Sequence, residues 1–484
     1  MEIPIKSKLK ELLSHGLVYG LTSSLQSVLG FVLLPILTVY YTPAEFGVYS
    51  IILLASALAS AIFYFGASSA LGRFYFDEDS DEYRKEIVST ALFITIAGAL
   101  ILVLLSFLFG DFLSNLLFGS PIYRLAIILA FSGAACGFLL NTMTLLLRYE
   151  KRSVLFMLVT LVGVVLNFII TYVLLTNFNL GILAPLWGSL CSMGLSFVFL
   201  FSIKFSSLSF NLNVDYFKKI LFFGVQFSVS GLLFYLLDYV DRIIIKEFLP
   251  MSDVGIYSLG CRVAAVINII LIMPFSLIWA PIRMQYAKSA DSQDFTSRIF
   301  SYLVIAGCTL VSFAILFGNE LMSLVFINDQ FAGSAKVFPL IMLSLLFYGF
   351  QNILDFGIYV SNKVYFYIII SFVGIIFNVA MNYWLIPIYG YMASAYVTFM
   401  TYFLTTSLIY FVSSMYHRMK LEWARIWSAF FVLILVYYFV NFAPILEFYS
   451  FAIRITLGFI LVLLIFFCWL TREEQKDVRN FFKI

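Results

Sequence analysis

Long runs of hydrophobic residues, separated by short polar breaks, make up almost the whole chain of 484 residues. The breaks contain charged residues, Gly, Pro or Asn, and they leave fourteen apolar stretches. Each stretch is about twice as long as the ten-residue alternating segment of a β-barrel, so all fourteen are predicted to be membrane-spanning helices. Their approximate limits are 17–40, 46–71, 87–109, 123–147, 154–176, 182–201, 220–247, 255–281, 299–317, 337–360, 364–387, 392–412, 426–442 and 451–470.

Composition excludes a water-soluble fold. The chain has 11% charged and 63% hydrophobic residues and a mean hydropathy of +1.02, whereas a soluble domain carries about 25% charged residues. A net charge of +3 without a basic run gives no reason to expect a nucleic-acid partner. Lys6, Lys8 and Lys10 precede an apolar run that is too long for a signal-peptide core, so we predict a retained first helix.

The distribution of Lys and Arg predicts the orientation of the spans. If the N-terminus and every second loop lie on one side, that side holds 23 of the 29 basic residues. The other side holds Arg124, Lys246, Lys336 and Arg454, while Arg242 and Arg262 lie in or near spans seven and eight. Loops rich in Lys and Arg stay in the cytoplasm. We therefore expect a multi-pass protein of the cytoplasmic membrane, with both termini cytoplasmic.

A weak internal repeat indicates a duplication. The segment 44–50 after span one matches 252–258 after span seven, at an offset of 208 residues. A second match, between 152–172 and 363–383, has an offset of 211. Transporters are often built from two such repeats. The predicted organisation is an N-terminal six-helix lobe over 1–203, a second six-helix lobe over 204–413, and two further spans with a tail over 414–484.

Several short segments, taken in order along the fourteen spans, resemble the polysaccharide transporter family. This family comprises the O-antigen and capsule-repeat flippases of the multidrug/oligosaccharidyl-lipid/polysaccharide exporter superfamily. The segments are Gly16-Leu17-Val18-Tyr19-Gly20, Leu34-Pro35, the Thr42-Pro43-Ala44-Glu45-Phe46-Gly47-Val48-Tyr49-Ser50 turn, Arg73-Phe74-Tyr75-Phe76, Asp241-Arg242, Gly255-Ile256-Tyr257-Ser258 and Arg262.

The resemblance implies both a fold and an activity. The fold would be all-α, with two six-helix lobes in a pseudo-twofold, V-shaped arrangement. The activity would be the transfer of an undecaprenyl-pyrophosphate-linked oligosaccharide from the cytoplasmic to the outer leaflet. The expected partners are this lipid-linked substrate and membrane lipids, together with a polysaccharide polymerase and other assembly proteins.

Arg262 is the first candidate for substrate binding, because an ionisable residue inside hydrocarbon is costly. It lies seven residues beyond Gly255, about 10 Å along the helix axis, in the predicted outer half of the membrane. A guanidinium offers a two-pronged fork to phosphate oxygens, as a pyrophosphate carrier requires. The alternative is a structural arginine that pairs with an acid or extends toward the membrane surface; the candidate acids are Asp238, Asp241 and Asp355.

Other polar residues in the spans have two interpretations each. Asp238, Asp241 and Arg242 either contact substrate or form a structural ion pair, since positions four apart share a helix face. Asp355 either carries a coupling proton or anchors the end of its span, and Arg73 is a second coupling or gating candidate. Uncharged polar residues are expected to join helices by hydrogen bonds rather than to bind sugars; these are Gln26, Asn141, Asn167, Gln226 and Asn378.

Nothing in the sequence indicates catalysis, a cofactor or a metal site. The two histidines, His15 and His417, lie near the predicted cytoplasmic surface, and no catalytic or nucleotide-binding motif is present. The leading hypothesis is therefore a flippase rather than an enzyme. The alternatives are a multidrug or peptidoglycan-precursor exporter of the same superfamily and a membrane-embedded polysaccharide polymerase or ligase. The first lobe has no Asp or Glu inside its spans, which argues against transport of cationic drugs.

Overall fold

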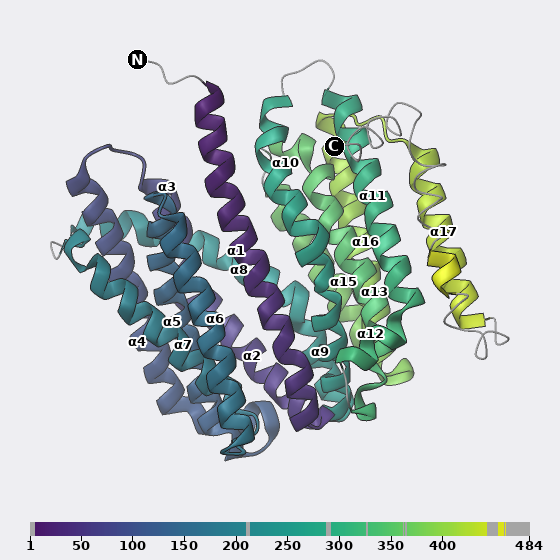
Figure 1. Cartoon of the computed structure of the whole chain (residues 1–484), viewed down its shortest axis with the longest axis horizontal. Helices are drawn as coiled ribbons and strands as arrows, with labels where there is room; N and C mark the ends of the chain where they lie inside the picture. Colours follow the sequence, from purple (N-terminus) through teal and green to yellow (C-terminus); the bar gives the residue numbers. More distant parts are fainter. Residues whose placement is uncertain are drawn as a thin grey trace. The chain divides into compact units, whose positions relative to one another are not determined.

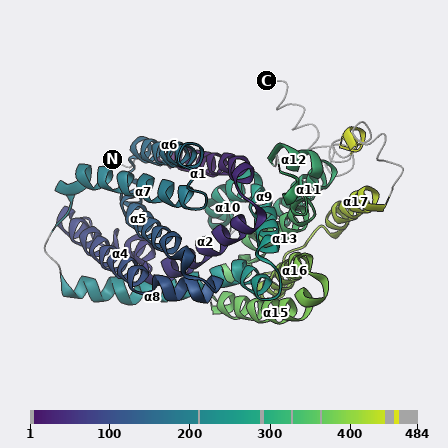
Figure 2. The same cartoon turned by 90° about the horizontal axis from the view of Figure 1, so that it is seen from below.

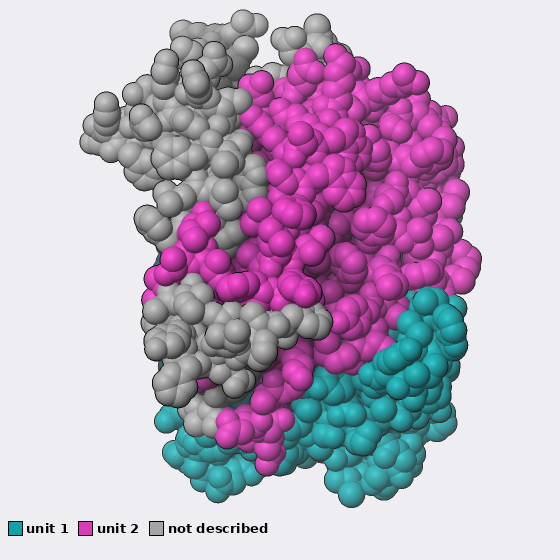
Figure 3. All heavy atoms as spheres, turned by 90° about the vertical axis from the view of Figure 1, so that its right-hand side faces the viewer, with its two compact units in different colours: residues 1–258, 378–391 teal, residues 259–377, 392–484 magenta. Residues whose placement is uncertain are grey.

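The computed structural model describes residues 5–209, 213–286, 292–325, 328–361, 363, 365–442, 454–458 and 460. All regular secondary structure in these residues is helical, which confirms the all-α prediction (Figure 1). The chain divides into two compact units, coloured separately in Figure 3. Unit 1 is Met1–Ser258 with Asn378–Tyr391, and unit 2 is Leu259–Phe377 with Met392–Ile484.

These units follow packing, whereas the predicted lobes follow the sequence repeat. The lobe boundaries after residues 203 and 413 therefore stay a prediction.

Unit 1 begins with eight α-helices in chain order, and the start of α9 and the end of α15 complete it. The eight are α1 (Ile5–Tyr40), α2 (Pro43–Phe63), α3 (Ala67–Phe74), α4 (Asp81–Phe118), α5 (Arg124–Tyr149), α6 (Ser153–Thr176), α7 (Leu183–Lys204) and α8 (Val214–Phe248). Short 3₁₀ turns at Pro121–Tyr123 and Phe205–Ser207 join some of them.

The helix starts in unit 1 follow from local capping chemistry. At α2, the Thr42 backbone N donates to Glu45 Oε2 at 2.8 Å, and Glu45 N donates to Thr42 Oγ1 at 3.3 Å, which is a capping box followed by a proline at the first position. At α4, Ser80 Oγ accepts from Tyr83 N at 3.0 Å. The turn residues in the sequence therefore fix where these spans begin.

The helices of unit 1 pack in a row. α4 contacts α5, α5 contacts α7, α7 contacts α6, and α6 contacts α1, while α2 and α8 pack against α4 and each other. Figure 2 shows α5 between α4 and α7. The unit's cavity is lined by α1, α5, α6 and α7.

The remaining helices belong mainly to unit 2. They are α9 (Met251–Ala264), α10 (Met273–Tyr286), α11 (Ser292–Leu316), α12 (Gly318–Val325), α13 (Ser334–Leu354), α14 (Phe356–Val360), α15 (Tyr365–Tyr389), α16 (Tyr391–Tyr416) and α17 (Trp423–Phe442). A further 3₁₀ turn covers Asp329–Phe331. In this unit α11 packs against α13 and α17, and α13 also contacts α12.

The eighth predicted span is not a regular helix. Between α9 and α10 lies a π-helical segment, η3 (Asn268–Ile272), directly before Pro274. Proline has no backbone N–H to donate and its ring clashes with the carbonyl four residues earlier; here that residue is Ile270, inside the widened segment. The irregularity before Pro274 is therefore a local π-bulge. Pro35, in contrast, lies inside the continuous helix α1.

Twelve helices among the described residues are long and apolar enough to cross a membrane, and they coincide with the second to thirteenth predicted stretches. Leu100, Leu104 and Leu108 lie on one face of α4 with exposed fractions of 66%, 58% and 65%. Such a continuous apolar face suits lipid rather than water. The chain is thus a multi-pass membrane protein.

The two outermost predicted spans differ. The apolar part of α1 is the shorter helix Ser24–Tyr40, and the stretch 451–470 lies largely outside the described residues. The total of fourteen spans stays a prediction.

The repeat is visible in the backbone of unit 1. α2 begins at Pro43 and α9 at Met251, the same 208-residue offset that the sequence shows. The two starts cross at repeat-related glycines: a Cβ on Gly47 would overlap the Met251 carbonyl oxygen, and a Cβ on Gly255 would overlap the Pro43 carbonyl oxygen. This backbone contact requires residues without side chains.

Candidate functional site

A cavity of about 380 Å³ lies inside unit 1, lined by α1, α5, α6 and α7. This volume is within the range of small-molecule sites, about 300–1,000 Å³. Its polar lining combines amides, hydroxyls and one guanidinium; the residues are Gln26, Asn141, Thr144, Arg148, Thr160, Asn167, Ser192 and Ser196. Among the described residues that line the cavity, Arg148 is the one charged side chain. The cavity therefore offers hydrogen bonds and one positive charge.

The two asparagines of the cavity also join helices. Asn141 Nδ2 donates to Tyr64 Oη at 3.2 Å, and Asn167 Nδ2 donates to Ser189 Oγ at 3.2 Å. The first bond joins α5 to the end of α2 and the second joins α6 to α7. The expected role as interhelical hydrogen-bond partners thus agrees with the geometry, and the same side chains line a cavity.

Arg148 lies at the basic end of unit 1, by which we mean the end that carries the loops 75–80 and 150–152. It is the second-last residue of α5, and its Cζ lies 4.6 Å from the centre of the Phe156 ring. The predicted stretch 123–147 ends one residue before Arg148, so the sequence left this residue in a loop and missed its place in the cavity. A signal was present, because Asn141, Thr144 and Arg148 are spaced by three and four residues and so share one helix face.

Asp241 and Arg242 lie outside this cavity and form a buried pair. Their exposed fractions are 3% and 7%, and Arg242 Nη1 lies 3.2 Å from Asp241 Oδ1. Tyr257 Oη donates to Asp241 Oδ2, and the Arg242 guanidinium lies 4.6 Å from the Tyr239 ring centre. The Tyr257 bond joins α9 to α8. Removing either Asp241 or Arg242 would leave the other charge buried without compensation. The side chain of Asp238 lies outside the described residues.

Arg262 is half-buried in α9. Because the helix starts at Met251 rather than Gly255, Arg262 lies eleven residues into it, about 17 Å along the axis. That is deeper in the span than the sequence indicated. Two of the acids considered as its partners pair with other arginines: Asp241 with Arg242, and Asp355 with Arg283.

Asp355 terminates α13 in unit 2 and is well paired. Arg283 Nη1 lies 3.3 Å from Asp355 Oδ1, and Tyr367 Oη donates to Asp355 Oδ2 at 2.7 Å. The Arg283 guanidinium also lies 3.8 Å from the centre of the Tyr359 ring. These contacts join α10, α13 and α15 at one carboxylate. Its role in coupling stays a prediction.

Arg73 lies at the basic end of unit 1, in the last turn of α3. Its Nη1 lies 2.6 Å from Asp77 Oδ1, and Lys219 Nζ of α8 lies 3.8 Å from Asp77 Oδ2. Arg73 is exposed, so this network is a solvated link between α3 and α8. The structure thus places Arg73, the Asp241 pair, Arg262 and Asp355 on separate elements.

The chain is thus a multi-pass membrane protein with a polar cavity inside one helical unit. Residues 12–287 match the family model described as polysaccharide biosynthesis protein. This is more than half of the chain, which therefore belongs to the polysaccharide biosynthesis protein family, as the resemblance indicated. No curated protein matches the sequence.

Solved structures show the same fold. The lipid II flippase MurJ, in an inward closed conformation, superposes with a TM-score of 0.73 at 14% identity, covering 93% of this chain and 97% of that one. A multidrug resistance MATE family transporter of the MOP superfamily, in an inward-facing conformation, gives 0.66 at 16% identity, covering 81% and 94%. A MOP superfamily transporter from Pyrococcus furiosus gives 0.57 at 14% identity, covering 84% and 95%.

Proposed function

We propose that this protein is a flippase that moves an undecaprenyl-pyrophosphate-linked oligosaccharide, such as an O-antigen, capsule or exopolysaccharide repeat unit, to the outer leaflet. The observation that carries the proposal is the lining of the unit 1 cavity. Amides and hydroxyls both donate and accept hydrogen bonds, as sugar hydroxyls require, and Arg148 matches an anionic group. Membership of the polysaccharide biosynthesis family supports the same substrate class.

The proposed mechanism is alternating access of two lobes around the substrate. The cavity volume suits only part of an oligosaccharide, so the sugar groups would bind there in part. Arg262 would supply the counter-charge that the pyrophosphate needs in a medium of low dielectric. The sequence has no nucleotide-binding motif, so an ion gradient, with Asp355 as the proposed coupling group, or consumption of the product would drive transfer. A polymerase and other assembly proteins would receive the product.

The rival transporters differ in the chemistry they need. A cavity for cationic drugs would need a carboxylate, whereas the described lining of the unit 1 cavity contains none. A peptidoglycan-precursor exporter would carry a related lipid-linked glycan. Because this chain has the fold of the lipid II flippase MurJ, we retain that alternative. The proteins named in the structural matches are flippases and transporters, which favours transport over the polymerase or ligase alternative.

Deletion of the gene is expected to remove a surface polysaccharide and to leave its lipid-linked repeat unit on the cytoplasmic leaflet. Immunoblotting would measure the surface polysaccharide, and lipid extraction would measure the accumulated lipid-linked repeat unit. Complementation by the intact gene would be the control. Unchanged surface polysaccharide together with reduced dye efflux would instead identify a drug exporter. Arrest of cell-wall growth with normal surface polysaccharide would identify a peptidoglycan-precursor exporter.

The proposed site of action is the cytoplasmic membrane, with the basic end of unit 1 in the cytoplasm. Alkaline-phosphatase fusions after Ser120 and Asn177 are expected to be active, and fusions after Asp79, Arg152 and Lys363 inactive, because of the asymmetry of Lys and Arg between the loops. An active fusion at Lys363 would contradict the two-lobe organisation.

A further inference from the structure

A second pocket lies at the basic end of unit 1, on the other side of α5 from the cavity. Its volume is about 530 Å³, and it lies where the loops 75–80 and 150–152 meet the first turns of α4. Five charged residues line it: Asp81, Arg84, Lys85, Glu150 and Arg152. We call it the basic-end pocket.

Of the two carboxylates of this pocket, Glu150 is paired with two cations. Glu150 Oε2 lies 3.1 Å from Arg152 Nε and also pairs with the buried Lys204. Asp81 is in the first turn of α4, where the helix dipole favours a negative charge. Lys85 is exposed and makes no ion pair with the residues that the structure describes. The pocket therefore has cationic capacity left for an anion.

Arg84 is held in position with one donor unused. Its Nη2 lies 2.6 Å from Asp79 Oδ1, and its Cζ lies 5.6 Å from the centre of the Tyr75 ring. Its Nε is buried without a hydrogen-bond partner in the described part of the chain. Asp79 is fully exposed, so water competes with that pair. Arg84 lines the pocket, and guanidinium donors suit phosphate oxygens.

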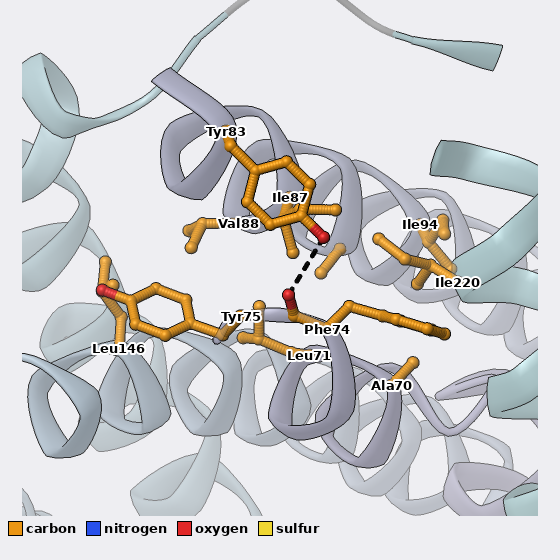
Figure 4. Packing of buried hydrophobic residues seen from close by; sticks show 11 residues of the cluster. Ala70, Leu71, Phe74, Tyr75, Tyr83, Ile87, Val88, Ile94, Leu146 and Ile220 are labelled. Atoms are coloured by element: carbon orange, nitrogen blue, oxygen red, sulfur yellow. Dashed lines mark hydrogen bonds between the residues drawn. The ribbon is translucent and has the colours of Figure 1, made fainter. Parts of the chain in front are cut away.

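The floor of the pocket is apolar and aromatic. Tyr75, Val88 and Leu146 belong to the hydrophobic cluster in Figure 4, where Tyr83 Oη donates to the Phe74 carbonyl oxygen at 3.1 Å. The Tyr75 and Tyr149 ring centres are 4.9 Å apart, and both rings contact Phe76. Phe76 is 59% exposed. Cations beside an exposed ring favour a ligand with both an anionic and an apolar part.

The place of the pocket at the ends of two candidate spans points to the source of that ligand. α4 and α5 contain two of the candidate spans, and the pocket lies where α4 begins and α5 ends. Span ends lie at the level of lipid headgroups, where aromatic side chains gather and basic pockets bind anionic lipids. We infer that the basic-end pocket binds the phosphate or diphosphate headgroup of a membrane lipid. This site is separate from the unit 1 cavity, and the inference does not depend on the proposed function.

The test uses the purified full chain in phosphatidylcholine nanodiscs, with farnesyl diphosphate as the probe and microscale thermophoresis as the measurement. Because two charge-assisted contacts are removed, R84Q combined with K85Q is expected to weaken binding about tenfold or more. If the double variant fails to fold, K85Q alone still tests the site, because Lys85 is exposed and makes no ion pair within the described part of the chain. K218Q is the matched control, since Lys218 is exposed on α8 and does not line the pocket.

The outcomes separate the possible ligands. Displacement of farnesyl diphosphate by phosphatidylglycerol at a small mole fraction would identify a phospholipid as the ligand, and resistance to displacement would identify an isoprenyl diphosphate lipid. Binding of inorganic pyrophosphate as tight as that of farnesyl diphosphate would overturn the lipid assignment. Equal loss of binding in K218Q, or no loss in K85Q and the double variant, would overturn the site. None of these measurements involves transport, so they fail or succeed independently of the deletion phenotype.

Discussion

Gly255→Ala is expected to destabilise the protein by about 1–3 kcal/mol, as overpacking does, and to abolish transport. The added Cβ would overlap the Pro43 carbonyl oxygen and lie 3.0 Å from Gly47 N where α2 and α9 cross. A carbonyl oxygen in a helix backbone has no rotamer to change, so the start of α9 must move. Arg262 lies two turns further along α9 and would move with it. Thermal unfolding in detergent and a surface-polysaccharide assay would measure the two effects.

The matched control is Gly231→Ala. Gly231 lies inside α8, and a Cβ there would meet nothing within 4 Å. Alanine in a helix interior is more favourable than glycine by about 0.5–1 kcal/mol, so this variant should be as stable as the parent or slightly more stable. If Gly255→Ala behaved like Gly231→Ala, the contact between the two repeat-related glycines would have no role in stability. Gly47→Ala should reproduce the defect, because the contact is reciprocal.

Arg262→Ala is expected to lower the transfer of a pyrophosphate-linked substrate by at least about a hundredfold. Two charge-assisted hydrogen bonds to phosphate contribute about 1.5–3 kcal/mol each, and a factor of ten corresponds to about 1.4 kcal/mol. The repeat-related position is Leu54, so the first repeat supplies no second arginine there. Arg262→Lys should restore transfer only in part, because an ammonium keeps the charge but loses the two-pronged geometry. Surface polysaccharide at equal protein abundance would be the measurement.

A structural role for Arg262 predicts a different result. If the guanidinium only neutralised an acid, adding Asp241→Asn, Asp238→Asn or Asp355→Asn to Arg262→Ala would restore transfer. We expect no rescue from Asp241 or Asp355, because each pairs with another arginine. Arg124→Ala is the control: Arg124 forms an exposed pair with Asp111 at 3.0 Å, and such pairs contribute about 0–1 kcal/mol. Loss of transport in that control would show that the assay responds to any missing arginine.

The membrane fold could be predicted from the sequence because span formation is a local property. Each run of about 20 apolar residues lowers its own free energy by entering lipid as a helix, so the second to thirteenth predicted stretches needed no information about neighbours. The start of α2 was marked by Thr42, Pro43 and Glu45, and the common start of α2 and α9 by the repeat. The π-bulge before Pro274 was only partly predictable, since a proline indicates an irregularity but not its form.

The positions of the polar residues within the site needed the tertiary structure. The predicted stretch 123–147 left Arg148 in the next loop, whereas α5 continues through Arg148, which shares a helix face with Asn141 and Thr144. The predicted stretch 255–281 likewise left Arg283 in a loop, although it pairs with Asp355 across 72 residues of chain. Spacing along one helix shows which side chains share a face, but it does not show which other helix that face meets.

The sequence by itself therefore determined that this chain is a helical membrane protein with an internal repeat and a basic side, because hydrophobicity and loop charge act segment by segment. Only the tertiary structure decided that α1, α5, α6 and α7 line a cavity without a carboxylate in its described lining, and that Gly47 meets Gly255. It also decided which acids pair with Arg242 and Arg283. The physical reason is that partners of buried polar groups depend on how each helix is rotated and packed, and burial makes those partners obligatory only after the helices have assembled.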